Sequence, residues 1–360
     1  MSGYTGPIID VDIHNAPKSS KDIVKRLPKR WRDYLDIYPP TTPDSQLARN
    51  MFRRGDTWGP NGEFPGSDYE VLRDQLLDRY NFYRGVLTHD IGHYPGLSNQ
   101  YFARDVCRAA NEWLREEWLE RDDRLFGLIV VPHSLPEESA AEVRHFAGDP
   151  QIVGVLFASN PLNRPLGDPL YHPIYEAASE CNLTIGVHQE PDRRQAGGAV
   201  QITSQLLYGS RVQTAMHYIS SLIVHGVFEK FPNLRFVIKE YGISWLPWLM
   251  WRLDQEYELL RRESPWVRRL PSDYIRDHIK LSTQPIETGA RNSDVGTYLS
   301  SVEGIEDLLC FSTDYPHGTM DDPLYVARIL PKEWHRKVFC DNACRSYGWK
   351  PPVESPAAVA

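Results

Sequence analysis

The first candidate for chemistry is a short apolar run near the start of the chain, IIDVDIHN, at residues 8–15. Side chains alternate between the two faces of a β-strand, so Asp10, Asp12 and His14 share one face. A carboxylate on a buried face is costly unless it is paired or bound to a cation. Asp12 and His14 stand nearest the carboxyl end of the run, and we expect both to hold one metal ion. Asp10 is expected to be a buried carboxylate held by hydrogen bonds.

Three more metal-capable side chains follow apolar runs elsewhere. His188 ends LTIGVH, Glu240 follows LRFVIK, and Asp314 follows DLLCFST. Taken singly, His188 would pass for a structural histidine and Asp314 for a helix N-cap or a turn residue. Their shared position at strand ends favours ligands, and imidazoles with carboxylates suit zinc, manganese or iron. We therefore predict a divalent metal site, with one ion or two, held by Asp12, His14, His188 and Asp314.

The elements that must position these residues alternate along the chain. Eight apolar runs of strand length are separated by amphipathic stretches of helix length; the runs are PIIDVDI, RGVLT, RLFGLIVVP, QIVGVLF, LTIGV, LRFVIK, HIKLS and DLLCFST. Strands alternating with helices indicate a parallel α/β sheet, and eight strands close a (β/α)8 TIM barrel. A doubly wound open sheet is the alternative, but HNAPKSS after the first run lacks its glycine-rich turn. We predict one barrel domain over residues 1–350.

One segment breaks this rhythm. Residues 15–68 follow the first predicted strand with many prolines and no strong periodicity. A long irregular segment in a compact domain is usually functional or disordered, and this one leaves from the carboxyl end of a barrel strand. We predict that 15–68 is a cap insertion over the substrate. Residues 351–360 are predicted to be a disordered tail.

Bulk properties exclude several classes of protein. The formal net charge of the 360 residues is −8, which argues against nucleic-acid binding. The chain start shows no signal-peptide pattern, and no apolar run approaches the ~20 residues that span a bilayer. Five scattered cysteines argue against a disulfide framework, so we expect a cytoplasmic protein. Trp245, Trp248 and Trp251 have helical spacing, which is typical of packing or of a subunit interface, so a homodimer is one expected assembly.

The chain resembles a known family at these motifs. The segments IIDVDIHN, SLIVHGVFEKFPNLRFVIKEYGISWLPWLMWRLD and FSTDYPH are similar to those of the amidohydrolase superfamily, in the branch that contains aminocarboxymuconate-semialdehyde decarboxylase and γ-resorcylate decarboxylase. The resemblance implies a distorted barrel with a divalent metal at its mouth. By the same resemblance, Asp12 and His14 match the ligand pair of the first strand, His188 the ligand of the fifth strand, and Asp314 the aspartate of the eighth strand.

The chain departs from these decarboxylases after its sixth predicted strand. There they carry a catalytic histidine, and this chain has Glu240. A glutamate acts as a general base or a ligand, and at neutral pH it is not a proton donor by default. We therefore take Glu240 and Asp314 as candidate proton carriers and Glu240 as a candidate ligand of a second metal.

Further histidines are candidates for supporting roles. His225 is predicted as a ligand of a second metal, and it lies eight residues from His217, on nearly the same face of a predicted helix. The alternative for both is a surface or packing position. His317, close to Asp314, is expected to orient a ligand or a bound water. The predicted substrate contacts are His89, His93, His217 and His317.

Four functions fit these residues. The leading prediction is metal-dependent hydrolysis of a small organic substrate, a carboxylic acid or a cyclic compound, through metal-activated water. The second is non-oxidative decarboxylation of an aromatic or unsaturated acid, which the resemblance implies. The third is a non-heme di-iron oxygenase, because mixed imidazole and carboxylate sets suit iron. The fourth is a barrel that binds a small molecule without turnover.

Overall fold

The computed structural model describes residues 4–38, 53–90, 94–158, 160, 162–189, 194–195, 198–199 and 211–352. Its centre is a sheet of eight parallel strands in the order β1-β2-β3-β4-β5-β8-β9-β10. The strands are β1 (Ile8–Asn15), β2 (Phe82–His89), β3 (Leu125–Val130), β4 (Ile152–Phe157), β5 (Thr184–His188), β8 (Phe236–Lys239), β9 (Ile279–Ser282) and β10 (Leu309–Cys310). A short antiparallel pair, β6 (Arg194–Gln195) and β7 (Gly198–Ala199), lies outside this sheet.

The first and last strands come together and close the sheet into a barrel. Val11 N donates to Phe311 O at 3.1 Å, and His14 N donates to Tyr315 O at 2.7 Å. Asp314 N donates to Asp12 O at 3.1 Å, so the closure runs along the metal-capable end of β1. The predicted α/β barrel is therefore confirmed.

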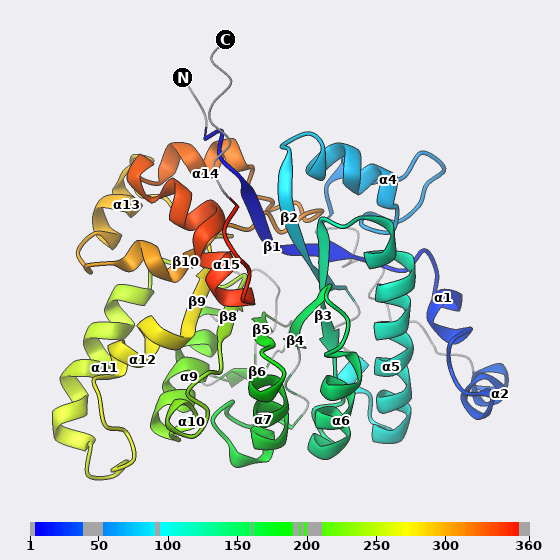
Figure 1. Cartoon of the computed structure of the whole chain (residues 1–360), viewed down its shortest axis with the longest axis horizontal. Coiled ribbons are helices and arrows are strands. Elements are labelled where there is room, and N and C mark those ends of the chain that lie inside the picture. Colours follow the sequence, from blue (N-terminus) through cyan, green and yellow to red (C-terminus); the bar gives the residue numbers. More distant parts are fainter. Residues whose placement is uncertain are drawn as a thin grey trace.

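Helices cover the outside of the barrel (Figure 1). The α-helices are α1 (Lys21–Val24), α2 (Lys29–Ile37), α4 (Tyr69–Leu72), α5 (Gln100–Glu117), α6 (Pro136–Phe146), α7 (His172–Glu180), α9 (Arg211–Val224), α10 (Val227–Lys230), α11 (Leu246–Leu260), α12 (Pro271–His278), α13 (Asp294–Leu299), α14 (Pro323–Ile329) and α15 (Asn342–Tyr347). Single π-helical turns cover Arg73–Leu77 and Lys337–Asp341. The 3₁₀ turns are Gly55–Thr57, Tyr94–Gly96, Leu119–Arg121, Pro169–Tyr171, Ile305–Leu308 and Lys332–Trp334.

The strands read as continuous apolar runs because both of their faces are covered. Every residue of β3 and β4 is buried, with the barrel interior on one side and helices on the other. This is the pattern expected of parallel strands in α/β proteins. Gly154 lets β4 and β5 approach, since a Cβ there would lie 2.2 Å from Thr184 O. Apolar burial thus fixes the strands, and the few polar residues among them must be explained one by one.

The segment predicted to be a cap starts at the barrel mouth and returns to it. After β1 the chain forms α1 and α2, which lie outside α5 (Figure 1), and Trp31 Nε1 donates to Asp105 of α5 at 2.7 Å. Residues 39–52 lie outside the described residues. The chain then returns beside the loop that follows β10: Arg53 forms a β-bridge with His317, and Arg54 N donates to Pro316 O at 3.0 Å.

Three other predictions concern the ends and the outer surface. The boundary at residue 350 stays a prediction, and residues 353–360 of the predicted tail lie outside the described residues. On α11, Trp248 and Trp251 are 52% and 49% exposed, whereas Trp245, just before the helix, is buried. The homodimer therefore stays a prediction. Within the described part of the chain, no helix is long and apolar enough to cross a membrane.

Candidate metal centre and active site

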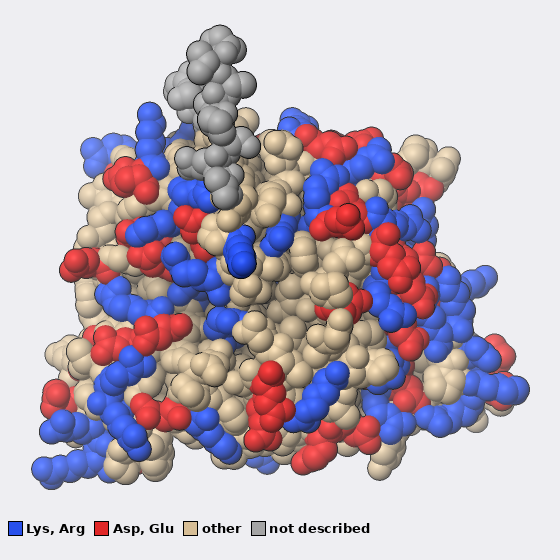
Figure 2. All heavy atoms as spheres, viewed as in Figure 1, with Lys and Arg blue, Asp and Glu red and all other residues tan. Residues whose placement is uncertain are grey.

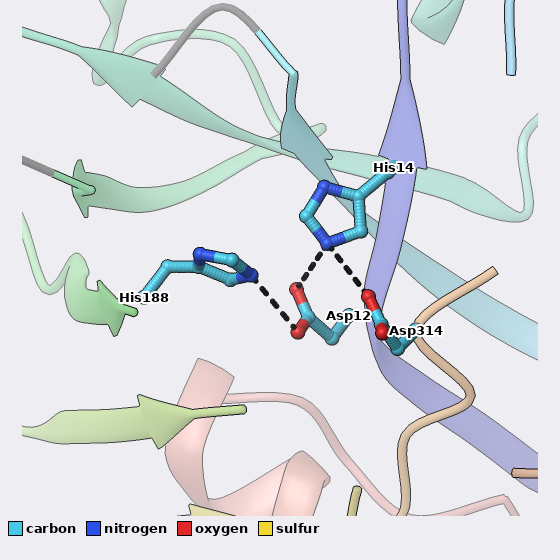
Figure 3. Close-up of side chains that lie close together, drawn as sticks. All are labelled: Asp12, His14, His188 and Asp314. Carbon is cyan, nitrogen blue, oxygen red and sulfur yellow. Dashed lines mark ion pairs between the residues drawn. The ribbon is translucent and has the colours of Figure 1, made fainter. Parts of the chain in front are cut away.

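Four of the predicted ligands meet at the carboxyl end of the barrel. One ligand atom each from Asp12, His14, His188 and Asp314 lies within 4.8 Å of the other three (Figure 3), and all four residues are buried. Two come from β1, one ends β5, and one follows β10. Parallel strands put their carboxyl ends at the same side of a barrel, which is why residues 300 positions apart converge.

The closest approaches define the group. His14 Nε2 lies 3.1 Å from Asp314 Oδ1 and 3.9 Å from Asp12 Oδ1. His188 Nε2 lies 3.6 Å from Asp12 Oδ2. Figure 3 shows both imidazole rings directed toward the two carboxylates. Two carboxylates and two imidazole nitrogens therefore face a common point.

The other nitrogen of each histidine is held from behind. His188 Nδ1 lies 2.6 Å from the carbonyl oxygen of Gln189 and donates there, so the neutral ring would present the lone pair of Nε2. His14 Nδ1 lies 3.3 Å from Asp90 Oδ1. Histidine ligands of metals are usually oriented in this way by a carbonyl or a carboxylate. Both rings are thus arranged to present Nε2 as a ligand atom.

The residues fit a divalent cation. Asp12 Oδ2, His14 Nε2 and His188 Nε2 are buried and make no hydrogen bond of good geometry within the described structure. Unsatisfied buried polar atoms are rare and costly, and a bound cation would satisfy all three. The donor set of two imidazoles and two carboxylates, without thiolate, suits manganese, iron or zinc.

Asp12 is fixed by two polar side chains inside the barrel. Its Oδ1 accepts from Thr88 Oγ1 at 2.6 Å and lies 3.6 Å from Lys239 Nζ. Lys239 is fully buried, and its Nζ also donates to Thr88 Oγ1 at 2.8 Å. Burial opposes ionisation of Asp12, but the charges of Lys239, His188 and His14 lower the pKa of this carboxyl below its usual value. Asp12 is therefore an anion whose Oδ2 stays free.

Asp314 occupies a strained backbone position beside two histidines. Its φ is +61°, a region that non-glycine residues rarely adopt and that is often found at functional sites. Its Oδ1 is also in close contact with His317 Nδ1, as predicted for a residue that orients a ligand. Burial raises the pKa of Asp314, but His317 and His14 outweigh this and lower it to about 2.

His14 is correspondingly basic. Burial of its ring opposes protonation, yet its contacts with Asp314 and Asp90 and the charge of Asp12 raise its pKa to about 10. Without a metal, the group thus holds a proton on His14 between carboxylates. A divalent cation would take the place of that positive charge.

Glu240 lies next to the group rather than within it. Its Oε2 is 3.1 Å from His188 Nε2 and accepts from Gln189 Nε2 at 2.9 Å, while Oε1 accepts from Arg211 Nη1 at 2.8 Å. Its φ is also +61°. Burial and the charge of Asp314 raise the pKa of Glu240, but Arg211 and His188 outweigh them and lower it to about 2. Glu240 is therefore an anion and only accepts hydrogen bonds.

A second group of possible ligands shares His14. One atom each from His14, Asp90 and His317 also lies within 4.8 Å of the others. Asp90 is already paired with the Arg53 guanidinium, and burial, which raises its pKa, is outweighed by Arg53 and His14, so the pKa lies well below its usual value. Arg53 is 6% exposed at its side chain, and its Nε and Nη1 have no partner in the described structure. Two buried donors at the mouth therefore have no partner among the described residues.

Asp10 has the structural role expected of it. Its Oδ1 accepts from Asp12 N at 2.9 Å and from Thr313 N at 3.1 Å, and Oδ2 contacts Thr313 Oγ1. Burial raises its pKa to about 7 despite these hydrogen bonds. Both oxygens of Asp10 are thus used within the protein.

Three predicted histidines are not part of the site, which corrects the sequence analysis. His89 is buried on the outer side of β2 with its ring 5.8 Å from that of Trp113 on α5, because its neighbour Thr88 takes the inward position. His217 and His225 are exposed on or just after α9, and His225 Nδ1 lies 2.8 Å from Ser221 O, one turn earlier. The described structure does not bring His225 to the ligand group. His93 lies outside the described residues.

The sequence analysis missed four residues of the site: Thr88, Asp90, Lys239 and Arg53. Lys239 had a signal, since a lysine at the end of the apolar run LRFVIK needs a partner when buried. Asp90 comes two residues after the end of the predicted second strand, but the sequence analysis selected its neighbour His89 as the candidate. Arg53 had no signal, because it lies in a segment without periodicity.

Comparisons with known proteins identify the family of this chain. A family model described as Amidohydrolase matches residues 9–349. Curated relatives include γ-resorcylate decarboxylases of Polaromonas sp., 23% identical over 267 residues that cover 71% of this chain and 79% of the relative, and of Rhodococcus jostii, 24% identical over 271 residues that cover 69% and 78%.

Solved structures show the same fold. The 5-carboxyvanillate decarboxylase of Sphingomonas paucimobilis superposes with a TM-score of 0.68 at 19% identity, covering 96% of this chain and 99% of that one. A dihydroxybenzoic acid decarboxylase of Polaromonas sp., with bound manganese and the inhibitor 2-nitroresorcinol, gives a TM-score of 0.67 at 17% identity, covering 96% and 97%.

Proposed function

Because the chain belongs to the amidohydrolase family, we propose that it is a metal-dependent carboxy-lyase that removes carbon dioxide from a hydroxylated aromatic acid without oxidation. The observation that carries the proposal is the buried group Asp12, His14, His188 and Asp314, in a chain whose curated relatives are decarboxylases. Hydrolysis was the leading expectation from the sequence, but the relatives favour the second prediction, non-oxidative decarboxylation.

The reaction needs a proton at the ring carbon and an electron sink nearby. The aryl carboxylate takes one proton at the carbon that bears the carboxylate, the bond between the ring and the carboxyl carbon breaks, and its electron pair returns to the ring as carbon dioxide leaves. A divalent cation held by the four ligands would supply positive charge for the oxygens of the substrate, and manganese is a fitting choice for this donor set.

Asp314 and His317 are placed to deliver the proton. Asp314 Oδ1 contacts His317 Nδ1, and the His317 side chain is 18% exposed, so it links the buried carboxyl to solvent at the mouth. Because the pKa of Asp314 is about 2, this carboxylate is ionised at neutral pH; in this proposal it takes a proton from water through His317 and, as a short-lived strong acid, passes it to the ring carbon.

Arg53 is placed to bind the substrate anion. Its free Nε and Nη1 are buried, and its remaining contact with Asp90 ties it to the ring of His14. A charge-assisted hydrogen bond from a guanidinium to a carboxylate is roughly twice as strong as a neutral one. The Nε–H and Nη1–H groups lie on different edges of the guanidinium, so a substrate carboxylate or phenolate oxygen at this position would accept from one of them.

Hydrolysis remains a second candidate because of Glu240. An ionised, acceptor-only carboxylate 3.1 Å from His188 Nε2 is a suitable general base for attack by water. In the decarboxylase proposal Glu240 has a positioning role, since it contacts His188 and is itself held by Arg211 and Gln189.

The test is an anaerobic assay of protein loaded with manganese against a panel of hydroxybenzoates. We expect carbon dioxide and the decarboxylated phenol in equal amounts, and one deuterium at the former carboxyl position when the reaction runs in D₂O. Chelation should stop turnover. Release of carbon dioxide that needs oxygen, or hydrolysis of esters or amides with no decarboxylation of any acid, would contradict the proposal.

Two neighbouring arginines provide a matched pair of variants. Arg53→Gln should raise KM for the acid about tenfold or more, the effect of losing one hydrogen bond to a charged group. Arg54→Gln is the control, because Arg54 is 37% exposed at its side chain and pairs with Asp56 at the surface. Equal KM values for the two variants would remove Arg53 from the substrate site.

A further inference from the structure

A cavity lies at the opposite end of the barrel from the metal-capable group. It has a volume of about 310 Å³ and is lined by Arg235, Phe236, Arg276, Asp277, His278, Lys280, Asp307, Arg345 and Ser346. These residues come from the start of β8 and β9, the end of α12, the 3₁₀ turn Ile305–Leu308 and the end of α15. We call this cavity the basal pocket. The four residues of β8 separate the basal pocket from Glu240, and at roughly 3.3 Å each they span about 13 Å.

Three cations of the basal pocket have no acidic partner in the described structure. Arg235 Nη2 donates only to the carbonyl and side-chain oxygens of Asn182, at 2.9 and 2.8 Å, and its buried Nε has no partner. Arg276 Nη1 donates to Glu303 O at 2.7 Å. Lys280 Nζ reaches only backbone carbonyls, at 3.2 and 3.5 Å. None of the three cations therefore forms an ion pair within the described residues.

The acids that line the pocket are already engaged. Asp307 accepts from Lys337 Nζ and from Arg345 Nη2, each at 2.9 Å. Asp277 accepts from Arg269 Nη1 at 2.6 Å. Each acid thus has at least one basic partner of its own, and the three cations remain in excess.

This excess has a physical cost that a bound anion would remove. Burial lowers the pKa of Arg235, and it lowers that of Lys280 although Asp307 and Asp277 act in the opposite direction, because desolvation disfavours the charged form. Figure 2, drawn from the same side as Figure 1, shows Lys and Arg side chains gathered over the region of β8, β9 and α15. The chain as a whole has a net charge of −8, so this is a local concentration against the overall charge.

We propose that the basal pocket binds the phosphoryl group of a small phosphorylated molecule, with Arg235, Arg276 and Lys280 as its cationic contacts. A phosphate monoester carries a charge of about −1.5 to −2 at neutral pH and offers three acceptor oxygens, which matches three unpaired cations better than one carboxylate does. The cavity is about ten times the volume of one water molecule, so it has room for an organic group on the phosphate.

Isothermal titration of the metal-loaded protein with inorganic phosphate and with ribose 5-phosphate tests this. We expect both to bind, with ribose 5-phosphate the tighter ligand if the source is organic. Arg276→Gln and Lys280→Met should each weaken binding about tenfold or more. Arg252→Gln is the control, since Arg252 lies on α11 and pairs with Glu256, and it should bind as the unaltered protein does.

Binding at the metal must be separated from binding at the basal pocket. Asp314→Asn alters the metal-capable group and should leave phosphate binding intact. Arg276 contacts only one carbonyl at the pocket, so its variant tests the proposal even where Lys280→Met fails to fold. No binding of phosphate at millimolar concentration, tighter binding of succinate than of phosphate, or loss of binding in Asp314→Asn but not in Arg276→Gln would each overturn the proposal.

Discussion

Asp10 and Asp12 lie two residues apart on the same inward face of β1, and they have opposite properties. Both oxygens of Asp10 are engaged with Thr313 or with the backbone of Asp12, and burial raises its pKa to about 7. Asp12 has a lowered pKa and a buried Oδ2 with no partner. The carboxylate oxygens of Asp10 are all satisfied by hydrogen bonds within the protein, whereas those of Asp12 are all satisfied only when a cation binds.

The difference follows from the groups that face each of the two carboxylates inside the barrel. Asp10 faces the hydroxyl and the backbone of Thr313, which are neutral donors. Asp12 faces Lys239, His188 and His14, whose charges favour its ionised form. The type of residue and the face of the strand therefore do not separate a structural carboxylate from a ligand. The separation comes from the neighbours.

The largest expected effect is the difference in turnover and metal content between a variant of Asp12 and a variant of Asp10. Asp12→Asn should lower turnover roughly a thousandfold, the scale of a lost charge contact in a transition state, and the purified protein should retain less metal. Asp10→Asn should keep its metal, because both oxygens of Asp10 already bond within the protein. Elemental analysis and the decarboxylation assay measure both. Equal metal loss in the two variants would mean that Asp10 and Asp12 do not differ in metal binding as described.

Lys239 tests the charge balance around Asp12. In metal-free protein, Lys239→Met removes a cation from a buried carboxylate, and breaking such a pair costs about 3–5 kcal/mol. A bound cation should restore much of that stability, so added manganese should raise the Tm of Lys239→Met more than that of the unaltered protein. Lys332→Met, at an exposed lysine, is the control. An equal response to manganese in all three would contradict this role of Lys239.

The barrel and the four ligand residues could be predicted from the sequence because each depends on the pattern of apolar and polar residues within a short segment. Apolar runs mark the buried strands, and a polar side chain that ends such a run is costly unless it has a function. Asp12, His14, His188 and Asp314 all carry this signal, and the barrel topology brings them together.

The remainder of the site depends on register and tertiary contact. In β2, Val86 and Leu87 are both apolar, so the run itself does not show which face Thr88 or His89 takes. Pairing with β1 decides this, since His14 lies opposite Thr88. Arg53 reaches Asp90 only after the long segment following β1 returns to the mouth, and no periodicity in the sequence indicates that return.

The pH dependence of stability sharpens the comparison further. The folded pKa of Asp10 is raised from 3.8 to about 7, so the folded state keeps a proton that the unfolded state has lost. Its contribution to stability is therefore present at low pH and is lost as the pH rises from about 4 to 7, by at most ~1.4 kcal/mol per pH unit. Asn cannot titrate, so Asp10→Asn should show a shallower decrease over this range.

Urea unfolding of the metal-free proteins measures that decrease. Asp321 also has a pKa raised by burial to about 7, and it is present in both proteins, so the difference between them isolates Asp10. Parallel stability curves between pH 4 and 7 would show that Asp10 is already ionised in the folded state.

The smallest expected effect concerns the histidines that the site excludes. His89→Gln and His225→Gln should each change turnover by less than about twofold, since neither ring belongs to the ligand group. The two positions differ in a useful way. His89 is buried against Trp113, and burial lowers its pKa to about 3, so its substitution should lower the Tm without altering KM or metal content. His225 is exposed, and its substitution should change none of the three quantities. A fall in metal content for His225→Gln would place a second ion near α9. The comparison of Asp10, which needs no cation, with Asp12, which needs one, would then not describe all of the metal-binding residues.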